Sequence, residues 1–548
     1  MTLGAGHDAV VIGSGAGGGA AAWQLCKMGL KVLLLEAGPA FDPSTDYPLS
    51  NAGWERRGFP KLPGSQAVLT YGDLGTLDAG FEDLASWSRG GFPWRLPVGA
   101  PRPPSDAGYA HVMGLGGSTL HFVGEAHRFH PDAFRRRSLT GQGLDWPIGY
   151  EDLEPFYTRA ENVIGVASDG VPDGRPRSAP YAMPAHPLGP GALAVTAAGA
   201  RIGQHWQVNP RAALSLPFDD RPACTYCGQC SRGCPIGDKG STDVTFLRQA
   251  ARTGRLTVVT GATVTRLVTG PNGRIARADV VVRGRAETVE TPIVFLCAGA
   301  VQTPRLLLLS ASVEHPDGLA NSSGQVGRNF IETLAWRSSG LVPGLTGSHR
   351  GLPADAICWA PDADDPGGFR LNHTTLEAGL NGPIAYANRL LTGHGVALKE
   401  ALRKGFGSAL AVGAIGELVP DDRSRIMLDA QMHDALGLPV ARISSVLTQA
   451  ALDRLRRMAR AARAVLAEAG AELVEEDGSR DAFTATHVFG TARMGTDPAF
   501  SVTNAMGRTH DHPNFWIADA SLFPSSGGGE SPSLTIMALA LRAAEAAA

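Results

Sequence analysis

Three short apolar runs along the chain predict buried strands. Residues 8–12 read Asp-Ala-Val-Val-Ile, residues 31–35 read Lys-Val-Leu-Leu-Leu, and residues 293–296 read Ile-Val-Phe-Leu. Runs of this length are typical of parallel strands that are covered on both faces. Between the first two runs lies the alanine-rich stretch 20–28, which favours a helix. The pattern therefore predicts a β-α-β unit and, for the chain as a whole, an α/β fold.

Two further patterns predict a hairpin and a surface helix. Residues 263–268 and 278–282 have strand character and flank Pro271-Asn272-Gly273, which is a strong turn signal. Residues 449–469 have an apolar stripe at helical spacing with arginines between its members, so we expect an amphipathic helix with solvated arginines. The stripe consists of Leu452, Leu455, Met458, Ala462 and Leu466.

A glycine-rich turn joins the first predicted strand to the helix. It has the form G-x-G-x-x-G at Gly13, Gly15 and Gly18, and Glu36 follows the second strand. We expect Gly13 to make the tight turn, Gly15 to let the backbone approach a pyrophosphate, and Gly18 to let the helix pack on the strand. The helix N-terminus offers N–H groups to phosphates, and Glu36 can accept hydrogen bonds from a ribose. The motif predicts dinucleotide binding, but it does not distinguish FAD from NAD.

The overall composition narrows the class of protein. The 548 residues include 49 basic and 52 acidic side chains, for a net charge of −3, and 43% are hydrophobic. A chain of this length can bury a large core in two or more domains, so its 69 glycines do not indicate disorder. Near-neutral charge argues against nucleic-acid binding, and no apolar run is long enough to span a membrane. Without a visible signal peptide, we expect a cytoplasmic protein, or a periplasmic one exported with a signal-bearing partner subunit.

Four of the seven cysteines lie within eleven residues, at Cys224, Cys227, Cys230 and Cys234. Their spacing, C-x2-C-x2-C-x3-C-P, is that of a ferredoxin cluster loop, so we favour an iron–sulfur cluster as their ligand. Structural zinc usually pairs two C-x-x-C units across about 15–20 residues, and disulfides are disfavoured without export. Zinc, disulfides and free thiols stay as alternatives. The isolated Cys26, Cys297 and Cys358 are expected to be buried packing residues.

Four segments resemble the glucose–methanol–choline (GMC) oxidoreductase family. They are Gly-Leu-Gly-Gly-Ser-Thr-Leu-His at 114–121, the Asp-Trp-Pro segment at 145–157, the stretch 299–310, and residues 514–542. The third departs from the family pattern at Ala311, where a glycine is usual. The resemblance implies FAD as the cofactor. It also implies a set of binding residues beyond the first glycine turn: Gly116, Gly117, Ser118, His121, Val264, Asp519 and Thr535.

The resemblance also implies two discontinuous domains. A Rossmann-like FAD-binding domain would take residues 1–45, 105–165, 222–320 and 480–548, including the cysteine loop 224–235. A substrate-binding domain and cap, with an antiparallel sheet and helices, would take residues 46–104, 166–221 and 321–479. Candidate pocket residues in the last piece are Trp359, Asn372, His373 and Arg389.

The catalytic residues follow from the same resemblance. His487 matches the family's catalytic histidine, and an imidazole suits a base that takes a hydroxyl proton because its ordinary pKa is about 6.5. Ser531 stands where the family usually has a second His or Asn, so we expect it to orient substrate rather than act as a base. The adjacent Glu530 is a candidate to compensate, although a carboxylate beside an electron-rich reduced flavin is unfavourable. His121 matches a position where some relatives attach the flavin covalently.

These observations predict an FAD-dependent dehydrogenase that oxidises an alcohol group of a sugar, glycoside or related alcohol. The resemblance to sugar and sugar-acid dehydrogenases implies a [3Fe-4S] cluster on Cys224, Cys230 and Cys234, or a [4Fe-4S] cluster that also uses Cys227. Electrons would then leave through the cluster to an electron-accepting subunit or a cytochrome. The alternatives are an oxidase that produces hydrogen peroxide and a non-redox flavoprotein with a lyase or assembly role.

Overall fold

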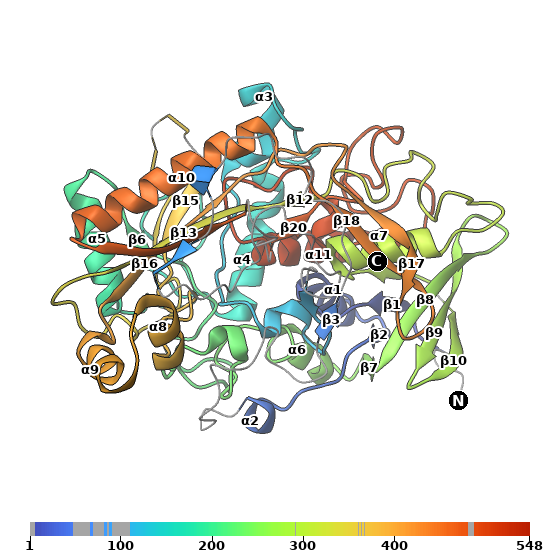
Figure 1. Cartoon of the computed structure of the whole chain (residues 1–548). Coiled ribbons are helices and arrows are strands. Elements are labelled where there is room, and N and C mark those ends of the chain that lie inside the picture. Colours follow the sequence, from blue (N-terminus) through green and yellow to red (C-terminus); the bar gives the residue numbers. More distant parts are fainter. Residues whose placement is uncertain are drawn as a thin grey trace.

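The computed structural model describes residues 6–47, 66–68, 82–84, 87–89, 110–290, 292–359, 361–362, 364–365, 368–479 and 487–548. Two large sheets organise these residues, one of five strands and one of seven. In Figure 1 the five-stranded sheet lies on the right and the seven-stranded sheet on the left. The predicted mixed α/β class, with a Rossmann-like part and an antiparallel sheet, is confirmed.

The five-stranded sheet is parallel throughout and has the order β21-β11-β1-β2-β7. Every residue of its first four strands is buried, which explains why those segments are apolar without alternation. Helix α1 packs against this sheet and against α11. The bounds are β1 (Ala9–Ile12), α1 (Ala16–Lys27), β2 (Val32–Glu36), β7 (Leu256–Thr260), β11 (Val294–Leu296), β21 (Phe515–Ile517) and α11 (Ser533–Ala547).

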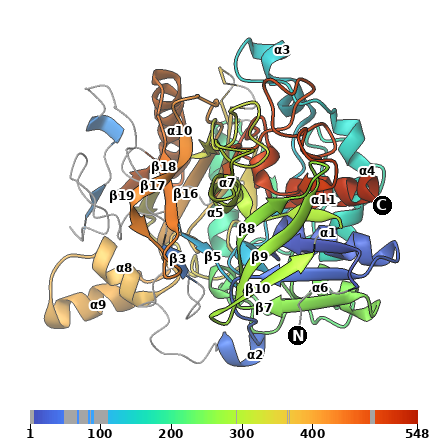
Figure 2. The same ribbon diagram turned by 90° about the vertical axis from the view of Figure 1, so that its right-hand side faces the viewer.

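A three-stranded antiparallel sheet lies beside the parallel one, as Figure 2 shows. It consists of β8 (Ala262–Thr269), β9 (Ile275–Val282) and β10 (Arg285–Glu290), and helix α7 (Gly299–Leu309) packs against β8. β8 and β9 are paired antiparallel across the turn that contains Gly273, whose φ is +67°. The predicted hairpin is therefore confirmed.

The seven-stranded sheet is antiparallel and has the order β4-β19-β13-β16-β15-β14-β6. Helix α10 (Gln449–Glu468) lies over β13, β15 and β16, and α5 (Pro190–Arg201) packs beside it. Helices α8 (Pro383–Leu390) and α9 (Gly395–Gly405) lie together at the edge of the molecule in both views (Figures 1 and 2). The strands are β4 (Trp87–Ser88), β6 (Gln207–Val208), β13 (Leu334–Leu341), β14 (Ala356–Cys358), β15 (Phe369–His373), β16 (Ala409–Gly416) and β19 (Glu472–Gly478).

Among the described residues, three two-stranded sheets lie outside these larger sheets. Strand β12 (Ile331–Glu332) pairs with β20 (Val488–Phe489), β17 (Arg425–His433) pairs with β18 (Pro439–Ser444), and β3 (Gln66–Val68) pairs with β5 (Ala110–Val112). The remaining α-helices are α2 (Pro43–Asp46), α3 (Arg136–Thr140), α4 (Tyr150–Ile164) and α6 (Phe246–Arg252). The 3-10 turns are η2 (Glu82–Leu84), η3 (Gly117–Leu120), η4 (Pro131–Arg135), η5 (Cys230–Arg232) and η6 (Ala520–Leu522).

Helix α10 confirms the predicted amphipathic helix, and its arginines are solvated only in part: Arg460 is exposed, whereas Arg454 is not. Thr448 caps its N-terminus by accepting a hydrogen bond from the Ala451 N–H. Arg454 is largely buried and donates to both carboxylate oxygens of Asp365, and Arg463 forms a two-point pair with Glu476. The sequence pattern could not show these pairs, because both carboxylates lie outside the helix, Asp365 in a loop and Glu476 on β19.

The sheets draw on separated pieces of chain. The parallel sheet takes its strands from residues 9–36, 256–296 and 515–517, and the seven-stranded sheet takes its strands from 87–88, 207–208 and 334–478. The domain boundaries stay a prediction, and most of the predicted piece 46–104 lies outside the described residues. In the part of the chain that the structure describes, no helix has both the length and the apolar character needed to cross a membrane.

Candidate active site

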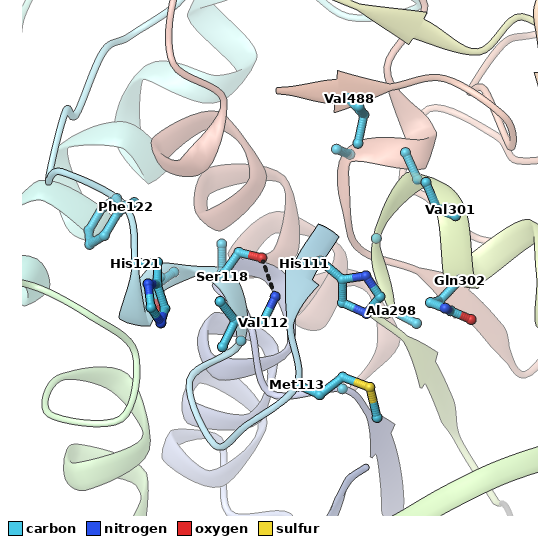
Figure 3. A pocket seen from close by; sticks show the side chains of 18 of the residues that line it. His111, Val112, Met113, Ser118, His121, Phe122, Ala298, Val301, Gln302 and Val488 are labelled. Atoms are coloured by element: carbon cyan, nitrogen blue, oxygen red, sulfur yellow. Dashed lines mark hydrogen bonds between the residues drawn. The ribbon is translucent and has the colours of Figure 1, made fainter. Parts of the chain in front are cut away.

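A cavity of about 1530 Å³ extends from the glycine turn of β1 to the seven-stranded sheet. Figure 3 shows the second glycine-rich turn, residues 114–121 with Ser118 and His121, on one side of the cavity. The start of α7, with Val301 and Gln302, lies on the other side. Ten of the residues predicted to be catalytic or cofactor-binding line the cavity: Gly13, Gly15, Glu36, Gly117, Ser118, His121, Val264, His487, Asp519 and Ser531.

Two glycine turns meet in the wall of this cavity. Gly15 is the residue before α1, and a Cβ atom on Gly117 would lie 2.7 Å from the Gly15 Cα atom. Side chains at these positions would fill the gap between the turns, so glycine keeps the backbone N–H groups at the α1 N-terminus open to a ligand. The volume exceeds that of most small-molecule pockets, so it has room for a dinucleotide and a substrate together.

Ser14, which sequence reasoning missed, links the two turns to Glu36. Its hydroxyl donates to the Glu36 carboxylate at 2.5 Å and accepts from the Gly116 N–H at 3.0 Å. The other Glu36 oxygen accepts from the Gly38 N–H at 2.8 Å. Burial raises the pKa of Glu36, and these hydrogen bonds offset part of that increase. Glu36 thus stabilises the turn and also faces the cavity.

Asp519 holds the start of α7 against the C-terminal segment. One carboxylate oxygen accepts from the Gly299 N–H at 2.8 Å and the Thr303 hydroxyl at 2.6 Å, and the other accepts two hydrogen bonds from Ser521. Burial raises its pKa. The four donors fix Asp519 at the wall of the cavity.

Three predicted cofactor-binding residues do not line the cavity. Gly18 packs the helix on the strand, since a Cβ there would lie 1.9 Å from the Gly13 carbonyl oxygen. Gly116 is part of the second glycine turn, and its N–H donates to the Ser14 hydroxyl. The Thr535 hydroxyl is buried and shares a 2.8 Å hydrogen bond with the Tyr157 hydroxyl. Their contacts are therefore with the protein around the cavity.

His121 is held beside the cysteine loop. Its Nδ1 lies 2.8 Å from the Ser231 carbonyl oxygen, and because a carbonyl can only accept, Nδ1 carries the hydrogen. The buried Lys239 ammonium donates to the carbonyls of Leu120, Phe122 and Cys230 at 2.8, 3.0 and 2.8 Å. This lysine fastens the His121 turn to the loop. Covalent attachment of a flavin to His121 stays a prediction.

His487 is half-buried at the beginning of the segment that forms β20. Pairing of β20 with β12 holds this segment, and the Thr333 N–H donates to the His487 carbonyl at 3.2 Å. Burial lowers the pKa of His487 to about 4, a shift that the Arg370 charge reinforces and the Glu125 charge opposes. The imidazole is therefore neutral at pH 7, the form that can accept a proton. Its neighbour Thr486 lies outside the described residues.

Ser531 belongs to a buried ion-pair network that sequence reasoning missed. Its hydroxyl donates to Glu125 at 2.7 Å. Arg370 donates to the two Glu125 oxygens at 3.0 and 2.9 Å, and its Nε donates to the Gly529 carbonyl at 2.7 Å. Glu125, Arg370 and Ser531 all line the cavity. The Ser531 oxygen accepts from Arg370 at 3.5 Å and its proton points to Glu125, so one lone pair is left to accept a hydrogen bond from a substrate hydroxyl.

Asn209 and His127 support this network through further hydrogen bonds. Asn209 donates to Glu125 at 2.7 Å, and its amide oxygen lies 2.7 Å from His127 Nε2. His127 Nδ1 accepts from the Ser531 N–H at 3.0 Å, so Nε2 carries the imidazole hydrogen. Burial lowers the pKa of His127 to about 3, which keeps it neutral. The pattern fixes Ser531 through both its side chain and its backbone.

Glu530 does not compensate for the serine in the way the sequence suggested. One of its oxygens accepts from Arg175 at 2.6 Å and from the His130 N–H at 3.1 Å, and Glu530 is not among the residues that line the cavity. Burial alone would raise the pKa of Glu530, but the Arg175 charge and the hydrogen bonds from Arg175 and His130 together lower it. Glu530 is therefore an ionised partner of Arg175, and the carboxylate beside Ser531 is Glu125.

Two of the four candidate pocket residues line the cavity and two do not. Asn372 and Arg389 line the cavity. Trp359 instead packs edge-on against the His127 ring, at 4.8 Å between centroids. The His373 ring lies 2.8 Å from both Asp355 and Thr375. Glu125 follows the second glycine turn closely, which was an available signal, whereas nothing in the sequence around Arg370 marks it.

The cysteine loop does not support the predicted iron–sulfur cluster. Cys234 donates to the Asp238 carboxylate at 2.7 Å, Cys224 accepts from the Tyr226 N–H at 3.4 Å, and Cys230 is buried on η5. Among the described residues, which include all four cysteines, no three His, Cys, Asp or Glu side chains are grouped to hold a metal. Burial and Asp238 raise the pKa of the Cys234 thiol to about 11. Cys26, Cys297 and Cys358 are buried, as predicted.

The parallel sheet, its glycine turn and the acid–base side chains around one cavity define an enzyme of the dinucleotide-binding α/β class. Residues 11–41 match a sequence profile described as NAD(P)-binding Rossmann-like domain, and residues 114–335 and 420–540 match two profiles described as GMC oxidoreductase. The chain belongs to the GMC oxidoreductase family.

Relatives of known activity align over nearly the whole chain. Fructose dehydrogenase large subunit from Gluconobacter japonicus is 29% identical, over 98% of this chain and 97% of its own. 2-Methyl-1,2-propanediol dehydrogenase from Mycolicibacterium austroafricanum is 30% identical, over 98% and 94%. 6'''-Hydroxyparomomycin C oxidase from Streptomyces lividus is 30% identical, over 99% and 91%. Both dehydrogenases and oxidases are thus similar to this chain.

Solved structures share the fold. Pyridoxine 4-oxidase from Mesorbium loti superposes with a TM-score of 0.66 at 19% identity, covering 98% of this chain and 99% of that one. Formate oxidase superposes with a TM-score of 0.65 at 15% identity, covering 100% and 98%. At these identities the likeness concerns the fold alone.

Proposed function

We propose that the protein is an FAD-dependent dehydrogenase that oxidises an alcohol group of a sugar, glycoside or related alcohol. The observation that carries the proposal is that His487 and the Glu125–Ser531 pair face the same cavity as the two glycine turns. A proton acceptor and a hydroxyl-orienting group therefore lie in one space with a phosphate-binding helix end.

The residues present fit FAD. The open gap at Gly15 and Gly117 and the N-terminus of α1 would receive the pyrophosphate, Glu36 and Val264 the adenosine side, and Ser118 and His121 the flavin side. When bound, FAD supplies an acceptor for the hydride of the alcohol carbon. Asp519, held by its four donors, would keep the start of α7 in place at this site.

His487 and Ser531 would divide the proton chemistry. The neutral His487 imidazole accepts the hydroxyl proton, and a positioned base of this kind contributes about 10²–10⁴-fold to the rate. Ser531 accepts a hydrogen bond from the substrate hydroxyl, since its own O–H donates to Glu125. The Glu125–Arg370 ion pair holds Ser531 in this orientation.

The substrate class rests on the relatives, which oxidise a sugar, a small diol and an aminoglycoside by name. An external electron acceptor, such as a partner subunit or cytochrome, is part of the proposal. An electron route through an iron–sulfur cluster is not part of the proposal, because the four thiols of the loop 224–235, all within the described residues, are not grouped to hold a cluster.

Anaerobic flavin bleaching by a panel of sugars and alcohols tests the proposal. We expect at least one substrate to bleach the flavin, His487→Ala to slow bleaching by 10²-fold or more, and the control His394→Ala, at an exposed position, to leave it unchanged. An unaffected His487→Ala rate would overturn the assignment of the base, and no bleaching by any compound would favour the non-redox alternative.

Turnover in air separates a dehydrogenase from an oxidase. We expect slow turnover with oxygen and fast turnover with an artificial acceptor. A high yield of hydrogen peroxide without added acceptor would replace the dehydrogenase by an oxidase. Iron analysis of the same sample tests the cysteine loop independently.

A further inference from the structure

The ribbon formed by β17 and β18 carries a second pocket, of about 620 Å³, which shares no lining residue with the large cavity. Four arginines from three chain segments line it: Arg328, Arg423, Arg425 and Arg442. Asp422 is the one carboxylate among the described residues that line it. Neither the family resemblance nor the proposed reaction uses these residues.

Strand register places two of the arginines on one face of the ribbon. Met427 is directly opposite Arg442, and Arg425 is directly opposite Ser444. Since side chains two residues apart on a strand share a face, Arg425 and Arg442 are diagonal neighbours. At this spacing long side chains reach one another, so two guanidinium groups project from the same patch of sheet.

A third arginine is brought to this patch by a separate segment. Arg328 forms an isolated antiparallel bridge with Arg425, and the Ile426 N–H donates to the Gly327 carbonyl at 2.7 Å. The Arg328 Nε donates to the Gly324 carbonyl at 2.9 Å, which anchors the side chain. The position of Arg328 is therefore fixed by backbone pairing.

The charges of this pocket are poorly balanced. Arg423 donates to both oxygens of Asp421, at 2.8 and 2.7 Å, so its charge is offset. Arg328, Arg425 and Arg442 form no ion pair with any carboxylate of the described residues, although Asp429 lies near enough to Arg442 to interact at longer range. Unpaired like charges held together in a concave site are unfavourable unless an anion joins them.

We propose that this pocket binds a small anion with two or more negative charges, of the phosphate-ester or polycarboxylate class. Planar guanidinium groups match such groups with two parallel hydrogen bonds each, and their convergence from three segments suits a compact ligand. This inference goes beyond the proposed function and does not depend on it.

Calorimetric titration of the FAD-loaded protein with inorganic pyrophosphate tests the proposal. Loaded protein is used because FAD occupies the other phosphate-binding turn. We expect saturable binding that the double variant Arg425→Gln/Arg442→Gln weakens at least tenfold, that Arg328→Gln also weakens, and that Arg285→Gln, an exposed arginine on β10, leaves unchanged. Citrate should compete with pyrophosphate, and acetate at equal ionic strength should not.

Three outcomes would overturn the proposal. They are no saturable binding, equal weakening by the Arg285→Gln control, and unchanged binding in the double variant. The thermal unfolding midpoint of each variant shows whether the variant is folded. Because these arginine side chains are exposed, we expect their substitution to change the midpoint little.

Discussion

Glu125 shows how one side chain can determine the behaviour of another. It accepts four hydrogen bonds, two from Arg370 and one each from Ser531 and Asn209, so its own oxygens are occupied. Burial alone would raise the Glu125 pKa, but the charges of Arg370 and Arg211 and the Ser531 hydrogen bond together keep it far below its usual range. Glu125 is therefore a fixed anion that orients Ser531 and is not itself a base.

The depressed pKa of His487 predicts the acid side of the pH profile. Because burial lowers this pKa to about 4, the imidazole stays neutral from pH 7 down to about pH 5. We expect kcat/KM to stay level over that range and to fall as pH drops through about 4, as measured by anaerobic reduction across pH 3.5 to 8. A fall centred near pH 6.5 would show that the residue titrates as a solvated histidine.

Removing the Glu125 charge should weaken the fold as well as the site. Glu125→Gln leaves the buried Arg370 guanidinium without a counter-charge, which costs about 3–5 kcal/mol when one partner of a buried pair is lost. Urea unfolding measures the change in the free energy of unfolding. The matched control Glu290→Gln, at an exposed position on β10, should stay within about 0.5 kcal/mol of the parent. An equally small change for Glu125→Gln would mean that the pair contributes little.

At the scale of elements, the pairing of β12 with β20 positions His487 and also buries a carboxyl group. Glu332 lies opposite Val488, is 1% exposed, and accepts a hydrogen bond from Ser445 at 2.8 Å. Burial raises its pKa to about 8, so the folded protein holds a proton there that the unfolded chain releases above about pH 4.5. The folded state binds more protons in this window, and stability therefore falls as pH rises from about 4.5 to 8.

Glu332→Gln should remove that pH dependence, because glutamine resembles the protonated acid. We expect the variant to unfold at a higher temperature than the parent at pH 8.5 and at a similar temperature at pH 4.5, as followed by circular dichroism. A difference of equal size at both pH values would point to altered packing instead.

The same scale shows what the sequence could predict. The apolar runs that became β1, β2 and β11 identify a buried parallel sheet because every one of their residues is covered. Strand β15 escaped prediction, because Arg370, Asn372 and His373 are polar yet buried, and polar residues ordinarily indicate a loop. The Glu125–Arg370–Ser531 network was not predicted either, since the partners that offset the buried Arg370 charge and hydrogen-bond to it lie 245 and 161 residues away.

At the scale of the whole molecule, the large cavity lies where the parallel and antiparallel parts meet, so its occupant contacts segments from both. A ligand that binds the folded state alone stabilises it, by about 2.7 kcal/mol at a free concentration of one hundred times Kd. We expect FAD added to protein stripped of cofactor to raise the unfolding free energy accordingly, and riboflavin, which lacks the pyrophosphate, to raise it less. Equal effects of the two would show that the glycine turns do not hold phosphate.

The packing of α11 on α1 and of β21 on β11 has a consequence for synthesis. A ribosome makes α1 and β11 hundreds of residues before their partners α11 and β21, so these apolar faces stay uncovered while the residues between them are made. Asp519 and Ser531 arrive with the same late segment, and without them the cavity has an open wall. Closure of the cavity wall and completion of the core therefore both wait for residues 515–547, and until these fold into place α1 and β11 lack the partners that cover them.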